Sequence, residues 1–201
     1  MRVEDALSQI EAIHEQLTKA EVYRGFQVWG VAAAGLLGLS AAIAQPWIPG
    51  VDDAVGFVRY WLIIAAAGIV IAGSSGVHAY LYQEDEHDRR RTRRLMSQLV
   101  PCLLAGAAVT YTLPKLGDDH VFLLPGIWAM LFGLGLVASR PYLPRAIGWV
   151  CLYHLAAGSF LLLNVSNHLA GAGWQVGGVF GLGQLAAAYV LYLNVERADH
   201  A

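Results

Sequence analysis

The chain has little charge and almost no cysteine. Only 14% of its 201 residues are Asp, Glu, Lys or Arg, against about 25% in an average soluble protein, which excludes an ordinary soluble globular domain. The two cysteines, Cys102 and Cys151, both fall in apolar stretches, so the sequence indicates small packing residues and neither a disulfide framework nor a metal site. The first 25 residues also lack the continuous apolar segment of a cleavable signal peptide.

Long apolar runs are what the sequence has in place of charge. Hydrophobic residues make up 57% of the chain, and crossing a hydrocarbon core of about 30 Å takes roughly 20 helical residues. The runs are continuously apolar and do not alternate as in a transmembrane barrel, so they favour helices. We predict an all-α, integral membrane six-helix bundle with spans near 26–48, 58–82, 95–114, 121–139, 146–165 and 172–195.

Positive charge predicts the orientation of this bundle. Eleven of the thirteen Lys and Arg residues fall on one side of the predicted spans, and only Arg59 and Lys115 fall on the other. Since Lys and Arg accumulate on cytoplasmic loops, both termini should be cytoplasmic, including a short tail at 196–201. With six spans, both termini must lie on the same side of the membrane, which agrees with this orientation.

Residues 1–25 precede the first span and predict an amphipathic cytoplasmic helix. Apolar residues recur every three or four positions there, at Val3, Leu7, Ile10, Ile13 and Leu17. The polar face is mostly acidic, whereas helices that lie on anionic lipid carry Lys and Arg on that face. We therefore expect this helix to pack on protein, which could be the chain's own cytoplasmic loops, a second copy or another membrane protein.

A dense cluster of arginines lies between the second and third spans. It comprises Arg89, Arg90, Arg91, Arg93 and Arg94. The cluster either pins the topology or binds anionic lipid headgroups. Nucleic acid is not an expected partner, because the run is short and follows its own carboxylates at Asp85 and Glu86.

Small residues and tryptophans indicate how the spans pack. Gly173, Gly177 and Gly181 place a glycine at every fourth position of the sixth span, a pattern that lets two helices approach closely, either inside the bundle or in a dimer. Five tryptophans lie near predicted helix ends, where their rings favour the headgroup layer, and Trp128 is the exception. The five are Trp29, Trp47, Trp61, Trp149 and Trp174.

Two histidines, His78 and His154, are the candidates for cofactor binding, because a titratable group inside a bilayer is costly and therefore often functional. Together with Tyr153 they could form a haem-binding or small-solute-handling site, with both imidazoles as ligands of a b-type haem. Their expected depths differ by roughly 7 Å at 1.5 Å per residue. The simpler interpretation is a buried histidine that hydrogen-bonds a neighbouring helix.

Two further patterns suggest chemistry less specifically. The segment Gly73-Ser74-Ser75-Gly76 is similar to the glycine-flanked serine of rhomboid intramembrane proteases, which would make Ser75 the nucleophile of an intramembrane hydrolase. That family carries its serine on the fourth span, whereas Ser75 is on the second. Asp118, Asp119, His120 and His168 lie in two outer loops without a metal-binding spacing, so we predict no metal site there.

Several segments together resemble uncharacterised bacterial six-span integral membrane proteins. They are Arg59-Tyr60-Trp61, the arginines of 89–94, Leu124-Pro125-Gly126-Ile127-Trp128 and the segment from Ser139 to Arg145. The resemblance implies a bacterial cytoplasmic (inner) membrane and no activity. We therefore expect a non-enzymatic accessory, scaffold or regulatory membrane subunit that acts through protein-protein contacts, with itself or another membrane protein.

Overall fold

The computed structural model describes residues 28–82, 86–165 and 172–196, and of residues 75–82, 86–92 and 195–196 it describes the backbone alone. Every element in these ranges is helical, which confirms the all-α prediction. The predicted amphipathic helix at 1–25 lies outside the described residues, as does most of the predicted tail at 196–201.

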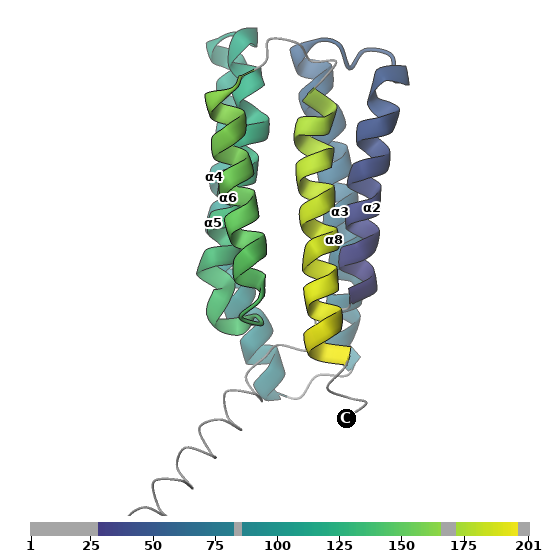
Figure 1. The fold of residues 1–201 in the computed structure, drawn as a ribbon, viewed down its shortest axis with the longest axis vertical. Helices are drawn as coiled ribbons and strands as arrows, with labels where there is room; N and C mark the ends of the chain where they lie inside the picture. Colours follow the sequence, from purple (N-terminus) through teal and green to yellow (C-terminus); the bar gives the residue numbers. More distant parts are fainter. Residues whose placement is uncertain (1–27, 83–85, 166–171, 197–201) are drawn as a thin grey trace, which may run out of the picture.

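Six long helical segments account for most of the described chain (Figure 1). Five are the α-helices α2 (Val28–Ala44), α3 (Ala54–Tyr82), α4 (Glu86–Leu116), α5 (Leu124–Ser139) and α6 (Ile147–Leu163). The sixth consists of the π-helix η4 (Trp174–Gly178), the α-helix α8 (Val179–Leu191) and the π-helix η5 (Tyr192–Glu196). Short 3-10 helices stand in the connections: η1 (Gln45–Trp47), η2 (Asp118–Leu123) and η3 (Arg140–Tyr142).

Five of the helical segments are long and apolar enough to cross a membrane. The exception is α6, an apolar helix of 17 residues, which is at the lower limit of the length that spans a bilayer. The helix α4 begins at Glu86 and so includes the arginine cluster in its first turns. It ends before Gly117, whose φ of 142° favours glycine and turns the chain into η2.

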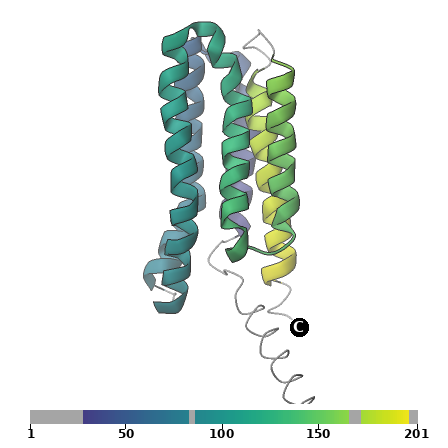
Figure 2. The ribbon, with the colours of Figure 1, turned by 90° about the vertical axis from the view of Figure 1, so that its left-hand side faces the viewer.

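The helices form a closed ring in chain order. Each packs on the next, α2 through α6, and α6 packs on α8, which returns to α2. Figures 1 and 2 show the helices side by side, with successive helices running in opposite directions. The start of α2 and the end of η5 therefore lie at one end of the bundle, together with the start of α4 and with η3. We call this the arginine end, since Arg93, Arg94, Arg140 and Arg145 lie there, while Arg59 and Lys115 lie toward the other.

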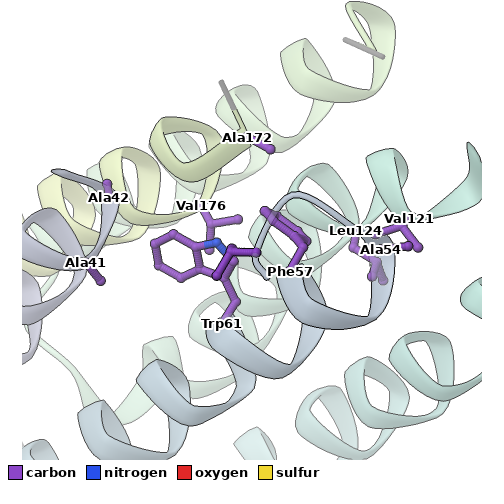
Figure 3. Close-up of a cluster of buried hydrophobic side chains, with 10 residues drawn as sticks. Ala41, Ala42, Ala54, Phe57, Trp61, Val121, Leu124, Ala172 and Val176 are labelled. Carbon is purple, nitrogen blue, oxygen red and sulfur yellow. The ribbon is translucent and has the colours of Figure 1, made fainter. Parts of the chain in front are cut away.

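The larger of the two apolar cores lies toward the end of the bundle opposite the arginine end. Its buried residues come from four of the helices and from the α2–α3 and η2 connections, and include Phe57, Trp61 and Val176 (Figure 3). The second core, around Val28, Ile147 and Leu191, lies at the arginine end. Neither core takes a buried residue from the described side chains of α4.

Trp61 corrects one of the predictions from the sequence. Its ring is only 3% exposed and is packed inside the larger core, where the prediction placed it in the headgroup layer. Its Nε1 donates a hydrogen bond of 2.9 Å to the buried Gln45 Oε1. This bond lets the indole lie inside the bundle, because its buried N–H then has a partner within the protein. By contrast, Trp29, Trp47, Trp149 and Trp174 are all exposed.

Polar groups within the helices find partners nearby. Trp128, the tryptophan predicted away from the helix ends, donates from Nε1 to Thr110 Oγ1 at 2.8 Å, and Thr110 in turn donates to the Gly106 carbonyl of its own helix. Thr112 and Ser40 donate to carbonyls four residues earlier. Such bonds satisfy hydroxyl groups that face an apolar environment.

Candidate functional site

His154 lies between α5, α6 and α8 and is the candidate that the structure defines best. It stands midway along α6 and is completely buried, with an exposed fraction of 0%. Its Nδ1 lies 2.9 Å from the Val150 carbonyl oxygen of the preceding turn. A carbonyl oxygen only accepts, so Nδ1 carries the proton of the neutral ring and Nε2 carries the lone pair.

Three aromatic rings surround this imidazole. The ring centroids of Phe132 on α5, Tyr153 on α6 and Phe180 on α8 lie 4.9, 5.2 and 5.7 Å from that of His154. Phe132 and Phe180 also contact each other, at 5.4 Å. The Tyr153 hydroxyl donates to the Val179 carbonyl at 3.2 Å, which ties α6 to the start of α8. His154 is thus part of the contact between three helices.

The Nε2 atom of His154 faces the backbone of α8. Nε2 has no hydrogen-bond partner among the described residues. A methyl group built on Gly183 would overlap His154 Cε1 and would lie 2.5 Å from Nε2. The absence of a side chain at Gly183 is therefore what lets α8 close over the imidazole.

This packing decides what the imidazole can bind. A haem iron would have to bind Nε2 on its lone-pair side, where Gly183 now lies. The residues around His154 therefore fit a haem only if α8 separates from α6. The other predicted ligand, His78, belongs to α3, and its side chain lies outside those that the structure describes.

The structure does not describe the side chain of the serine that was predicted as a nucleophile, as is also the case for His78. Ser75 lies on α3, and its side chain is outside the described part of the chain. The hydroxyl of its neighbour Ser74 is described, and it donates to the Ile71 carbonyl of the same helix. The role of Ser75 as a nucleophile therefore stays a prediction.

The glycines predicted to pack the sixth span lie against α2. The Gly177 backbone contacts Gly38, and the Gly181 backbone contacts Gly35, so that two pairs of glycines face each other. Gly173, one turn earlier, lies against Gln45. All three predicted glycines thus face into the bundle, where an added methyl group would collide with α2 or Gln45.

The loop residues weighed as a metal site do not form one in the described chain. Asp118, Asp119 and His120 belong to η2 and are exposed, and His168 lies outside the described residues. Within the described ranges, no three His, Cys, Asp or Glu side chains are grouped closely enough to hold a metal ion.

The predicted arginine cluster is partly described. Arg93 and Arg94 are exposed on α4, whereas Arg89, Arg90 and Arg91 belong to the backbone-only segment of that helix. A further arginine that sequence reasoning did not single out, Arg140, lies at the same end. Its guanidinium lies against Gly148, where an added methyl group would be 3.2–3.3 Å from Nη2, Cζ and Nε.

Sequence reasoning also missed the role of Gln45 and Gly183. The role of Gln45 could have been predicted, since the indole N–H of a tryptophan inside an apolar helix needs a hydrogen-bond acceptor and the sequence offers few polar side chains that could be one. Gly183 carried no signal, because it is one of 22 glycines in the chain.

Comparisons with known proteins identify no relative of this chain. No family model, no curated protein and no solved structure matches it.

Proposed function

We propose that this protein is a six-span component of a bacterial inner membrane that acts without catalysis, as an accessory or scaffold subunit that contacts another membrane protein. Its termini are cytoplasmic, so the arginine end faces the cytoplasm. The segregation of the cations supports this orientation, because Arg93, Arg94, Arg140 and Arg145 share one end. α6, with 17 residues, spans as the fifth helix.

The observation that carries the proposal is the uneven burial of the helices. Only 6% of the apolar segment of α4 and 17% of that of α3 is buried inside the bundle, against 39–44% for the segments of α2, α5 and α8. These two neighbouring helices also pack less extensively on each other than on α5 and α2. The apolar segments of α3 and α4 are therefore the least buried of the five, and we place the partner in the membrane plane against them.

The composition of α4 suits contact with another helix. Its outward residues include the small Ala105 and Ala108 beside Leu104 and Tyr111, all exposed. Small residues let helix backbones approach closely, and association in lipid depends on such packing more than on hydrophobicity. The glycines of the sixth span, in contrast, are already occupied by α2.

Haem binding and hydrolysis are less well supported. Nε2 of His154 is covered by Gly183, and the side chain of Ser75 lies outside the described part of the chain. The N-terminal helix predicted at 1–25 remains a second surface through which the same partner could bind.

Enlarging the small residues of α4 should release the partner. We expect the double variant Ala105→Leu/Ala108→Leu to fold normally, because both side chains point away from the bundle, and to lose at least tenfold in copurified partner. The measurement is quantitative mass spectrometry of proteins that copurify with a tagged chain from membranes of its native host.

The matched control is Ala33→Leu/Ala156→Leu, which enlarges exposed alanines on α2 and α6. It should retain the partner. If both double variants capture the same proteins in the same amounts, the α3–α4 side is not a partner surface and the proposal is wrong.

A further inference from the structure

The contact between α6 and α8, which we call the seam, separates two pairs of helices that are each joined by close backbone contact. In the α5–α6 pair, a methyl group on Gly126 would lie 3.0 Å from the Gly158 carbonyl oxygen, and one on Gly158 would lie 2.8 Å from that of Gly126. In the α2–α8 pair, Gly177 and Gly181 bring the backbones together. The α5–α6 pair lies to the left in Figure 1 and the α2–α8 pair to the right. Because α6 and α8 pack less extensively on each other than on their own pair partners, the seam is weaker than the contact within either pair.

His154 is the side chain of α6 that meets the α8 backbone at the seam. Its Nδ1–H donates to the Val150 carbonyl, and its Nε2 lies against Gly183 without a hydrogen-bond partner among the described residues. The neutral ring suits this position, because Nε2 then carries a lone pair and needs no acceptor. A protonated ring would carry a second N–H at Nε2, and no acceptor lies within its reach in the described chain. The closed seam therefore accommodates the neutral imidazole and not the imidazolium.

The groups that surround His154 in the described chain cannot neutralise a charge on its ring. The rings in contact with it are Phe132 of α5, Tyr153 of α6 and Phe180 of α8. Of these only Tyr153 is titratable, and its hydroxyl already donates to the Val179 carbonyl. The helices α5, α6 and α8 contain no Asp, Glu, Lys or Arg. Aromatic rings attract a cation, but more weakly than the water that a buried imidazolium would lose.

The helix on the other side of the seam has the features of one that can shift. α8 lies between the π-helices η4 and η5, and π-helical turns are rare and often mark functional sites. η4 contains two glycines and ends at Gly178, five residues before Gly183. The hydrogen bond from Tyr153 to the Val179 carbonyl crosses the seam at 3.2 Å, which is long for a hydroxyl donor, since about 2.7–2.8 Å is usual. A weak hydrogen bond and apolar packing thus keep α6 and α8 together.

We propose that the α6–α8 seam is a proton-operated switch, which is closed while His154 is neutral and opens when its Nε2 is protonated. The proton enters during brief openings of the seam, and its binding then favours the open state, in which water reaches Nε2. Lowering the pH supplies the proton, so acid opens the seam and a neutral or alkaline pH keeps it closed. The proposal rests on contacts inside the bundle, and not on the orientation or the partner proposed above.

The native thiol of Cys151 reports whether the seam is open. Cys151 lies one turn before His154 on α6, is buried, and shares the second core with Ala187 and Leu191 of α8. Its rate of reaction with N-ethylmaleimide is measured in Cys102→Ala protein in mild detergent, at about pH 8 and about pH 5. Each rate is divided by that of the same protein unfolded in sodium dodecyl sulfate at the same pH, which removes the pH dependence of the thiol itself. We expect this ratio to rise at least about fivefold from the higher to the lower pH, and to stay constant when His154→Leu is added.

Two tyrosine variants test the seam while the imidazole is kept. Tyr153→Phe removes the hydrogen bond across the seam and should raise the ratio at both pH values. Tyr60→Phe is the matched control, because its hydroxyl donates to the Ala41 carbonyl at 2.8 Å between α3 and α2, and it should leave the ratio unchanged. A ratio that does not rise in acid, an equal rise with His154→Leu, or equal effects of the two tyrosine variants would each overturn the proposal. None of these outcomes affects copurification through α4, so the two proposals fail separately.

Discussion

Alanine in place of Gly177 should destabilise the protein more than any other single methyl group on the sixth span. The added Cβ would overlap the Gly38 carbonyl oxygen of α2 and would lie 2.7 Å from Trp61 Cη2 and 2.8 Å from Ala42 Cβ. Because one of these atoms belongs to the backbone, relief requires α2 and the sixth span to move apart. Overpacking of this kind costs about 1–3 kcal/mol or more.

The neighbouring glycine supplies the control for this prediction. A methyl group on Gly178 would meet only the Trp174 ring at 3.5 Å, which is ordinary van der Waals contact. Gly178→Ala should therefore unfold at or above the wild-type temperature, since alanine favours a helix over glycine. Thermal unfolding in mild detergent, followed by tryptophan fluorescence, measures both. Equal unfolding temperatures for the two variants would show that Gly177 does not pack on α2.

The second large effect is expected between Gly183 and His154. Gly183→Ala should destabilise the bundle, because its methyl group would overlap His154 Cε1. In a His154→Ala background the imidazole is absent, and the same Gly183→Ala change should then be nearly neutral. The coupling between two residues in contact lies in the range of about 0.5–3 kcal/mol.

A double-mutant cycle in the same unfolding assay measures this coupling. The control is His154→Leu, which has a similar side-chain volume and lacks the unpaired Nε2, so its stability should stay within about 1.5 kcal/mol of wild type. Additive effects of Gly183→Ala and His154→Ala would contradict the described contact between α6 and α8. A much larger loss in His154→Leu would instead mean that Nε2 has a partner.

The helices themselves could be predicted from the sequence because the length of each apolar run indicates a membrane-spanning helix. Each apolar run must cross a fixed thickness and satisfy its own backbone, which requires a helix of about the observed length. The first residue of α4 could not be predicted from the length of its apolar run. Its first turns are polar and cationic, so an apolar window detects the helix only from Leu95, nine residues after Glu86.

Rotations of the helices about their axes could not be predicted. Helix α6 is apolar all around, so nothing in its sequence indicates that His154 faces Gly183 on α8. The glycine pattern at 173, 177 and 181 indicated a close approach but not its partner, because an internal helix and a second copy require the same small residues. The contact with Gly35 and Gly38 results from the packing of all the helices together, which this pattern of glycines does not indicate.

Trp61 shows a related limit. Tryptophan near a helix end favours the interface on average, because its N–H there finds water or headgroups. Gln45, sixteen residues earlier, provides that acceptor inside the protein instead. The average preference of tryptophan for the interface does not indicate whether one particular tryptophan has a hydrogen-bond acceptor inside the protein.

The central claim, six crossings with both termini in the cytoplasm, depends on whether the 17-residue helix α6 spans the membrane. The most direct test is labelling of single cysteines, Asn167→Cys and Ala201→Cys, each introduced in a Cys102→Ala/Cys151→Ala background. A membrane-impermeant maleimide is added to cells in which the outer membrane has been permeabilised and the inner membrane is intact. Six crossings predict that Asn167→Cys reacts at once and that Ala201→Cys reacts only after the inner membrane is permeabilised. If α6 does not cross, the two positions exchange behaviour, and that result would contradict the account.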